Sequence, residues 1–210
     1  MGAMLLLFFC LLLGMAVRRF TRAPEGMAHA LNWWVLYIAL PAIVLELIPQ
    51  LHYRSDLWFP VVAAWIVFAG AWIVFALVGH WRGWSRARIG TLTLVCGLGN
   101  TSFMGYPLIR ALHGQEGLKL AVVADQLGTF PLLASAAIVV ASLYSGQSPH
   151  PRQVLRRVFT FPAFLALLVG LVVGQLGGWP DIANKVFSPI GATMSPLALF
   201  SVGMQFHFGS

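Results

Sequence analysis

Charged residues are scarce in this chain. Lys, Arg, Asp and Glu make up 9% of the 210 residues, hydrophobic residues make up 59%, and the mean hydropathy is +0.83. This composition excludes an ordinary soluble domain. The net charge of +7 does not indicate a nucleic-acid partner, because the basic residues lie in small groups between apolar runs and not on one soluble face. The sequence therefore predicts an integral membrane protein whose surroundings are the lipid bilayer.

Cysteine and the common catalytic motifs are equally scarce. The two cysteines, Cys10 and Cys96, lie inside apolar runs, and their spacing fits neither a disulfide framework nor a zinc site. The chain contains no HExxH metal motif, no GxSxG nucleophile motif and no GxxxxGK phosphate loop. We therefore expect neither an enzyme nor an ATP-driven pump, and no metal or cofactor. A proton or a sodium ion remains as the expected coupling ion of a transporter.

Long apolar runs dominate what is present. About 20 apolar residues cross a bilayer as a helix, and seven runs approach that length. They cover residues 3–19, 29–50, 58–80, 89–112, 117–144, 160–177 and 184–207. The first run has no basic residues before it, which argues for a retained helix over a signal peptide. We predict an all-α membrane protein with seven transmembrane helices.

The basic residues alternate between the connecting segments. The first, third and fifth segments carry Arg18, Arg19, Arg22, Arg82, Arg86, Arg88, Arg152, Arg156 and Arg157, and the others carry Arg54, Arg110, Lys119 and Lys185. An excess of Lys and Arg marks cytoplasmic loops. The alternation therefore predicts a multi-pass protein of the cell's inner (plasma) membrane, with its N-terminus outside and its C-terminus inside.

Two short matches indicate an internal repeat. "LLLG" at 11–14 matches "LLVG" at 167–170, an offset of 156, and "LPAIVL" at 40–45 matches "SPLALF" at 195–200, an offset of 155. Nearly equal offsets in consecutive helices favour a duplicated unit. Five spans per unit is an odd number, so the second copy must enter the membrane in the opposite orientation, as in many secondary transporters.

The repeat divides the chain into three parts. We predict a first five-helix repeat over 1–145, a cytoplasmic loop over 146–158, and the start of an inverted second repeat over 159–210. A complete second repeat would need about 100 further residues. We therefore expect a chain that is shortened at its C-terminus and lacks three helices.

The fourth span, "LVCGLGNTSFMGYPLI", contains residues that interrupt a helix. Gly97, Gly99, Gly105 and Pro107 weaken its continuity, and the polar segment 100–102 offers partners for freed backbone groups. Irregular backbone survives in a membrane where it lines a cavity or is buried in protein. A broken helix presents carbonyls from one half and amides from the other, which suits ion and anion binding. The alternative is a closely packed helix with a proline kink.

The segment "GNTSFMGYPLIRALHGQEGLKLAVVADQLGTF", residues 99–130, resembles the auxin efflux carrier family of membrane transporters. "LNWWVLYIALPAIV" at 31–44 and "SPLALFSVGMQF" at 195–206 resemble that family's second and seventh helices. The resemblance implies ten helices in two inverted repeats, with the fourth and ninth helices broken and crossing at the substrate site. This chain stops before the eighth helix, which departs from that pattern.

Acidic residues are rare within the predicted spans. Intramembrane carboxylates are costly and usually face a bundle interior or a cavity. Asp125 and the adjacent Gln126 are candidates for a coupling-ion site or for polar support of the broken helix, with a place near the outer interface as the alternative for Asp125. We expect Glu46, close to the end of its span, to be interfacial.

These observations favour a secondary active transporter. The resemblance implies a small organic anion as substrate, a carboxylate such as malate or malonate or an auxin-like acid, and the short central loop favours the bacterial malate and malonate permeases. The expected substrate-binding residues are Gly99, Asn100, Thr101, Ser102, Gly105 and Pro107. The alternative is a non-transporting sensor or scaffold, or an inactive fragment of the fold. We expect no uptake by these 210 residues alone, unless a homodimer supplies the second broken helix.

Overall fold

A computed structural model describes residues 2–51, 57–145, 152, 156 and 159–206 of the chain, and every element within them is helical. The elements are α1 (Gly2–Phe20), α2 (Met27–Trp34), η1 (Val35–Ala39), α3 (Leu40–Leu47), η2 (Ile48–Gln50), α4 (Trp58–Trp81), α5 (Arg86–Gly97), η4 (Thr101–Gly105), α6 (Tyr106–Val123), η5 (Ala124–Thr129), η6 (Leu132–Ala136), α7 (Ala137–Ser145), α9 (Pro162–Gln175), α10 (Asp181–Ala192) and α11 (Met194–Gln205). The η2 segment is a 3₁₀ turn, and the other η segments are π-helical turns within longer helices.

The helices lie in the predicted apolar runs. By length and composition, Met27–Gln50, Trp58–Trp81, Arg86–Tyr144 and Asp181–Gln205 are long and apolar enough to cross a membrane, and Pro162–Gln175 is a shorter apolar helix. The all-α fold is thus confirmed, whereas the count of seven crossings stays a prediction. Most of the predicted loop over 146–158 lies outside the described residues.

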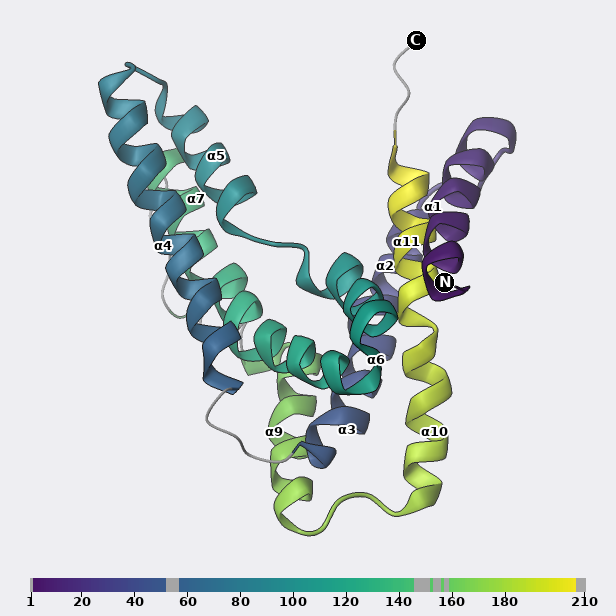
Figure 1. Ribbon diagram of the computed structural model, residues 1–210. Helices are drawn as coiled ribbons and strands as arrows, with labels where there is room; N and C mark the ends of the chain where they lie inside the picture. The colour runs from purple at the N-terminus through teal and green to yellow at the C-terminus, as the bar shows by residue number, and fades with distance from the viewer. Residues whose placement is uncertain (1, 52–56, 146–151, 153–155, 157–158, 207–210) are drawn as a thin grey trace.

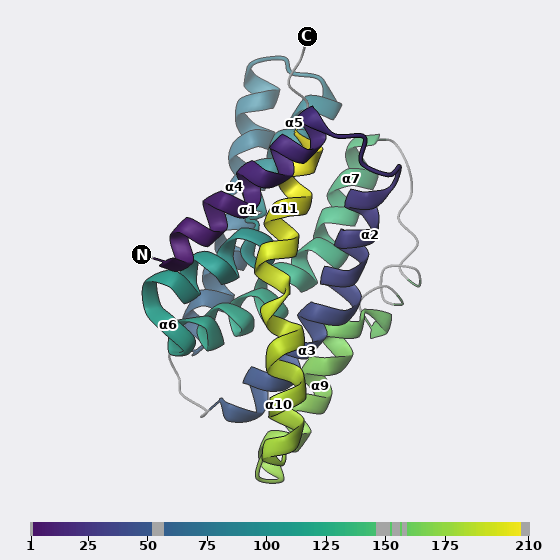
Figure 2. The same ribbon diagram turned by 90° about the vertical axis from the view of Figure 1, so that its right-hand side faces the viewer.

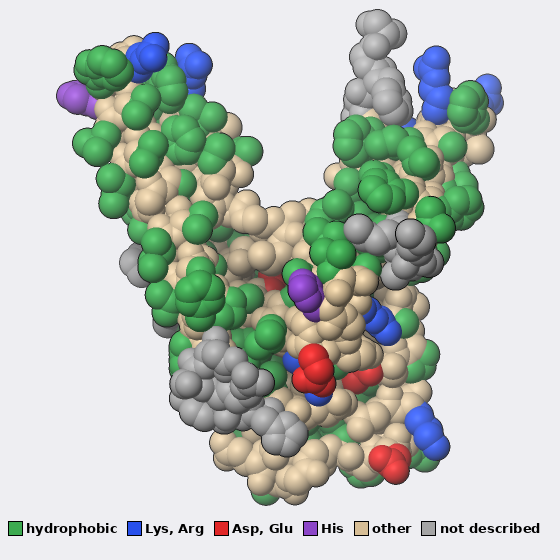
Figure 3. All heavy atoms as spheres, viewed as in Figure 1, with side chains coloured by type: hydrophobic (Ala, Val, Ile, Leu, Met, Phe, Trp, Pro, Cys, Tyr) green, Lys and Arg blue, Asp and Glu red, His purple; other side chains and the backbone are tan. Residues whose placement is uncertain are grey.

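The helices form two arms that rise from a common base (Figure 1). One arm contains α4, α5 and α7, the other contains α1, α2 and α11, and the base contains α3, α9 and α10. Figure 2 shows α11 between α1 and α2. The α6 segment lies between the arms, and the space-filling view in Figure 3 shows that the molecule is hollowed there. The chain between α5 and α6 therefore borders an open space.

Glycines bring α1 and α11 into direct backbone contact. A Cβ added at Gly14 would lie 2.2 Å from the carbonyl oxygen of Phe200, and one added at Gly203 would lie 2.2 Å from that of Leu11. Small residues permit such close approach of membrane helices, where packing replaces the hydrophobic effect as the source of association. The α1 and α11 helices of the second arm are therefore in contact through their backbones.

A second glycine contact joins α9 to the end of the helix formed by α2 and α3. A Cβ at Gly170 would lie 3.1 Å from Cβ of Ile48, and one at Gly174 would lie 3.2 Å from Cα of Pro49. Both glycines face the η2 turn. The α9 helix therefore packs closely against this end of the helix. This contact fixes the base from which the two arms rise.

Basic side chains gather at the free ends of both arms (Figure 3). Arg18 and Arg19 lie in the last turn of α1, and Arg86 begins α5 at the far end of the other arm. The guanidinium of Arg88 lies 4.5 Å from the ring centroid of Trp84, a cation–π distance. Basic and aromatic residues at the same end of both arms suit a membrane–water interface.

Candidate functional site

The helix of the predicted fourth span is interrupted. It ends at Gly97, and Leu98 (φ −116°, ψ 117°) and Asn100 (φ −82°, ψ 73°) have non-helical backbone before the helix resumes at Thr101. A Cβ at Gly97 would lie 3.1 Å from the Phe68 ring, so glycine allows α5 to pack closely on α4. The break lies between two helices of one predicted span, as the glycine, asparagine and proline content indicates.

Asn100 caps the helix that follows the break. Its Oδ1 accepts hydrogen bonds from the backbone amides of Phe103 at 3.1 Å and Met104 at 3.4 Å. Asparagine is a favoured N-cap because its short side chain replaces the missing backbone acceptor of the first turn. The side chain is exposed, and its amide nitrogen has no hydrogen-bond partner among the described residues.

Asp125 is the centre of a buried polar cluster. The carboxylate is 3% exposed, and its Oδ1 accepts hydrogen bonds from the hydroxyls of Thr101 and of Ser102, the latter at 2.9 Å. Its Oδ2 accepts from the Tyr106 hydroxyl at 2.9 Å and from Nε2 of Gln126 at 3.0 Å. Four neutral donors therefore surround one carboxylate. Three of them connect η4 and the start of α6 to Asp125 in η5.

A π-helical turn places an adjacent acid and amide side chain in the protein interior. Asp125 and Gln126 lie in η5, and both are buried although they are adjacent in sequence. Such turns widen the helix locally and are frequent at functional sites. Gly128, in the same turn, packs against α4, where an added Cβ would lie 3.1 Å from Cβ of Ala64. The turn thus fixes the acid against its neighbours.

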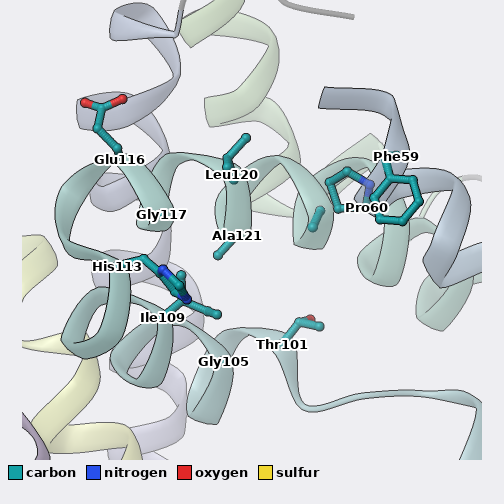
Figure 4. A pocket seen from close by; sticks show the side chains of 11 residues that line it. Phe59, Pro60, Thr101, Gly105, Ile109, His113, Glu116, Gly117, Leu120 and Ala121 are labelled. Carbon is teal, nitrogen blue, oxygen red and sulfur yellow. The ribbon is translucent and has the colours of Figure 1, made fainter. Parts of the chain in front are cut away.

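Two cavities meet at Thr101. The larger has a volume of about 810 Å³ and lies between the start of α4 and the two halves of α6 on either side of the kink at Gly114 (Figure 4). It is mostly apolar, with His113 and Glu116 at its exposed side. The smaller has a volume of about 260 Å³ and reaches the interruption at Gly97, Leu98 and Gly99.

The structure places the predicted residues in different surroundings. Gly99 and Gly105 line the cavities, together with Thr101, and Asn100 is exposed at the cap. Ser102 contacts Asp125, whereas Pro107 is buried in the first turn of α6 and lines neither of these two cavities. The structure therefore brings the polar residues together around the break and leaves Pro107 with a helix-starting position.

Sequence reasoning missed Tyr106. Its hydroxyl belongs to the Asp125 cluster, and the side chain is 1% exposed. Its place between Gly105 and Pro107 in a polar motif was the available signal, because a buried tyrosine hydroxyl usually has a hydrogen-bond partner. His113 and Glu116 line the larger cavity but were not among the predicted site residues. Glu116 forms an ion pair with Lys119 at 2.7 Å.

An apolar helical protein with an interrupted helix, a buried carboxylate and adjoining cavities has the features of a membrane transporter. The family of membrane transport proteins matches residues 1–210, and the chain belongs to this family. The predicted resemblance to transporters of the auxin efflux carrier type is thereby confirmed.

Two archaeal relatives match most of the chain. An uncharacterized transporter of Methanothermobacter thermautotrophicus is 25% identical over 199 residues, which cover 94% of this chain and 65% of the relative. An uncharacterized transporter of Methanocaldococcus jannaschii is 26% identical over 213 residues, covering 98% of this chain and 68% of the relative. The chain thus spans about two thirds of the length of these relatives.

Proposed function

We propose that this chain acts in secondary active transport of a small organic anion, a carboxylate such as malate or malonate or an auxin-like acid, by alternating access around the interrupted helix. The family and the transporter relatives support transport. The observation that carries the proposal is the break at residues 98–100. Leu98 and Gly99 line the smaller cavity, and Thr101, where the helix resumes, lines both cavities.

The electrostatics of the break suit an anion on one side. The helix that resumes at Thr101 presents the positive end of its dipole, and the exposed amide of Asn100 lies at the same end. The neighbouring Thr101 and Gly105 line the larger cavity, whose largely apolar wall suits the carbon skeleton of a small organic acid. The buried carboxylate of Asp125 would hold the helix start in place from the protein side.

The glycine contacts support an inverted repeat. At the offset of 156, Gly14 in the first repeat is equivalent to Gly170 in the second. At the offset of 155, Ile48 in the first repeat is equivalent to Gly203 in the second. Gly14 packs against Gly203, where an added Cβ would lie 3.1 Å from its Cα, and Gly170 packs against Ile48. Each of these two contacts therefore joins positions that are equivalent to those of the other contact at the offsets of the sequence matches. In such an architecture a second broken helix would complete the substrate site.

Binding of labelled malate or malonate to the purified chain in detergent tests the proposal. We expect saturable binding that unlabelled dicarboxylate displaces, and a roughly ten- to hundredfold weaker affinity in Asn100→Ala, since a hydrogen bond to a charged group contributes about 1.5–3 kcal/mol. Gln50→Ala, which changes an exposed amide at the end of η2, is the control and should bind as the native chain does. Equal binding by Asn100→Ala and the native chain would contradict the assignment of the anion to the break.

A further inference from the structure

Among the described residues, the side-chain amide of Gln126 is hydrogen-bonded through its nitrogen and not through its oxygen. It is 0% exposed, and its Nε2 donates to Oδ2 of Asp125 at 3.0 Å. Its Oε1 is buried and has no hydrogen-bond partner in the described part of the chain. Buried acceptors are nearly always paired, so an orphan next to a buried acid points to a donor that is present in another state.

The surroundings of Asp125 hold no compensating charge. The elements packed against η5 are α4, α6, α9, η4 and η6. Their ionisable residues are His80 in the last turn of α4 and Tyr106, Arg110, His113, Glu116 and Lys119 on α6, and of these Tyr106 hydrogen-bonds to Asp125. No Lys, Arg or His among the described residues forms an ion pair with this carboxylate. A negative charge here is held by neutral donors alone, which makes neutralisation by a cation favourable.

We propose that Asp125 and Gln126 form a site for one proton, with the Gln126 amide reversing its orientation when the proton binds. This deepens the proposed function, on which it rests, by naming the proton as the coupling ion. An O–H bond forms at Oδ2 of Asp125 as an O–H bond of a hydronium ion breaks, and the hydronium leaves as water through the cavity that Thr101 lines. The bond from Nε2 of Gln126 to Oδ2 breaks, and the new O–H donates to Oε1 of Gln126.

The geometry favours a proton over a sodium ion. Each carboxylate oxygen already accepts two hydrogen bonds, so a sodium ion would have to turn several donors away at once. A proton requires only a rotation of about 180° about the terminal bond of Gln126, whose amide oxygen and nitrogen have nearly the same shape.

Protonation has a consequence at the break. Hydrogen bonds to an ionised acceptor are roughly twice as strong as those between neutral groups. When Asp125 is neutral, the bonds from Thr101 and Ser102 weaken, and the start of the resumed helix is held less firmly. Proton binding would therefore loosen the segment that borders the proposed anion site.

Infrared difference spectroscopy tests this site without any anion substrate. The chain has three aspartates, Asp56, Asp125 and Asp181. In the Asp56→Asn/Asp181→Asn chain, labelled with ¹³C at the aspartate carboxyl, every aspartate band belongs to Asp125. On lowering the pH from about 9 to about 4, the range in which carboxyls titrate, we expect a protonated carboxyl band and a side-chain amide band that changes at the same midpoint.

Matched variants assign the bands. Gln126→Leu should remove the amide change and keep the carboxyl band, whereas Gln175→Leu, an exposed glutamine at the end of α9, should keep both. Asp125→Asn, added to the Asp56→Asn/Asp181→Asn chain, should remove the carboxyl band. A spectrum without that band, a band that responds to sodium at constant pH, or an amide change that persists in Gln126→Leu would overturn the proposal. Because no anion is added, a failure of anion binding would leave these results unaffected.

Discussion

At the scale of single residues, Asp125 shows how a chain with few charges keeps one in its interior. A buried carboxylate loses its hydration, and the loss must be offset by hydrogen bonds with good geometry. Thr101 and Ser102 supply two of these bonds from the start of the resumed helix, and Tyr106 supplies a third from the next turn. The acid therefore connects two helices that are separated by the kink at Gly114.

Replacing Tyr106 with phenylalanine should lower the free energy of unfolding by about 1.5–3 kcal/mol, because one hydrogen bond to a buried charged group is lost while the ring is kept. Reversible unfolding in mixed micelles measures the effect. Tyr37→Phe is the matched control, since Tyr37 is 45% exposed and stacks on Trp33 through its ring. Its change should stay within about 0.5 kcal/mol. A Tyr106→Phe protein as stable as the control would show that the carboxylate does not depend on this donor.

Residue types that act locally were predictable from the sequence, and tertiary partners were not. Asn100 and Pro107 act on their own backbone, so the break could be located without a structure. The contact of Gly97 with Phe68 is tertiary and was not predicted. Asn100 was expected to bind a substrate, which stays a prediction. The structure shows a second role for it, the capping of the helix that follows. The link from Tyr106 to Asp125 depends on the π-helical turn and on the bend at Gly114, which no local pattern specifies.

At the scale of elements, glycine allows two helices to pack closely together. The α1 and α11 helices contact each other through their backbones at Gly14 and Gly203, so a larger side chain at either position would force the helices apart. The α4 helix, by contrast, has Gly70 with no atom within 4 Å of an added Cβ. The same residue type is therefore a packing requirement at Gly14 and Gly203 and a neutral position at Gly70.

This difference gives a paired prediction. Gly14→Ala should destabilise the protein by about 1–3 kcal/mol or more, because the methyl group would meet the Phe200 carbonyl oxygen at 2.2 Å and the backbones must separate. Gly70→Ala should be neutral or stabilising by up to about 1 kcal/mol, since it only improves helix propensity. Thermal unfolding of both variants in detergent gives the comparison. Equal losses in the two variants would contradict the packing at Gly14.

At the scale of the whole molecule, the sequence predicted the all-helical class, because long apolar runs favour membrane helices. The arrangement into two arms was not predictable from those lengths. It depends on pairs such as Gly170 with Ile48, which are distant in the chain and become visible only in contact. The orientation in the membrane rests on the distribution of basic residues and stays a prediction.

Cysteine labelling tests the orientation. In a chain with Cys10 and Cys96 replaced by alanine, Phe20→Cys at the end of α1 should lie inside the cell, and Leu176→Cys after α9 should lie outside. Both positions are at least 80% exposed, at 82% and 80%, so access to water depends on the side of the membrane. An impermeant maleimide added to intact cells should label Leu176→Cys, and Phe20→Cys only after lysis. The reverse result would invert the predicted topology.

The interruption after α5 also bears on how the chain enters the membrane during synthesis. The 12 residues of α5 make a rod of about 18 Å, well short of the hydrocarbon core of about 30 Å. A translocon that releases helices one by one into lipid would leave the non-helical backbone of residues 98–100 facing acyl chains. The α4 and η5 segments pack beside the two half-helices in the folded protein. We therefore expect the stretch from Trp58 to Ser145 to enter the bilayer as one preassembled group.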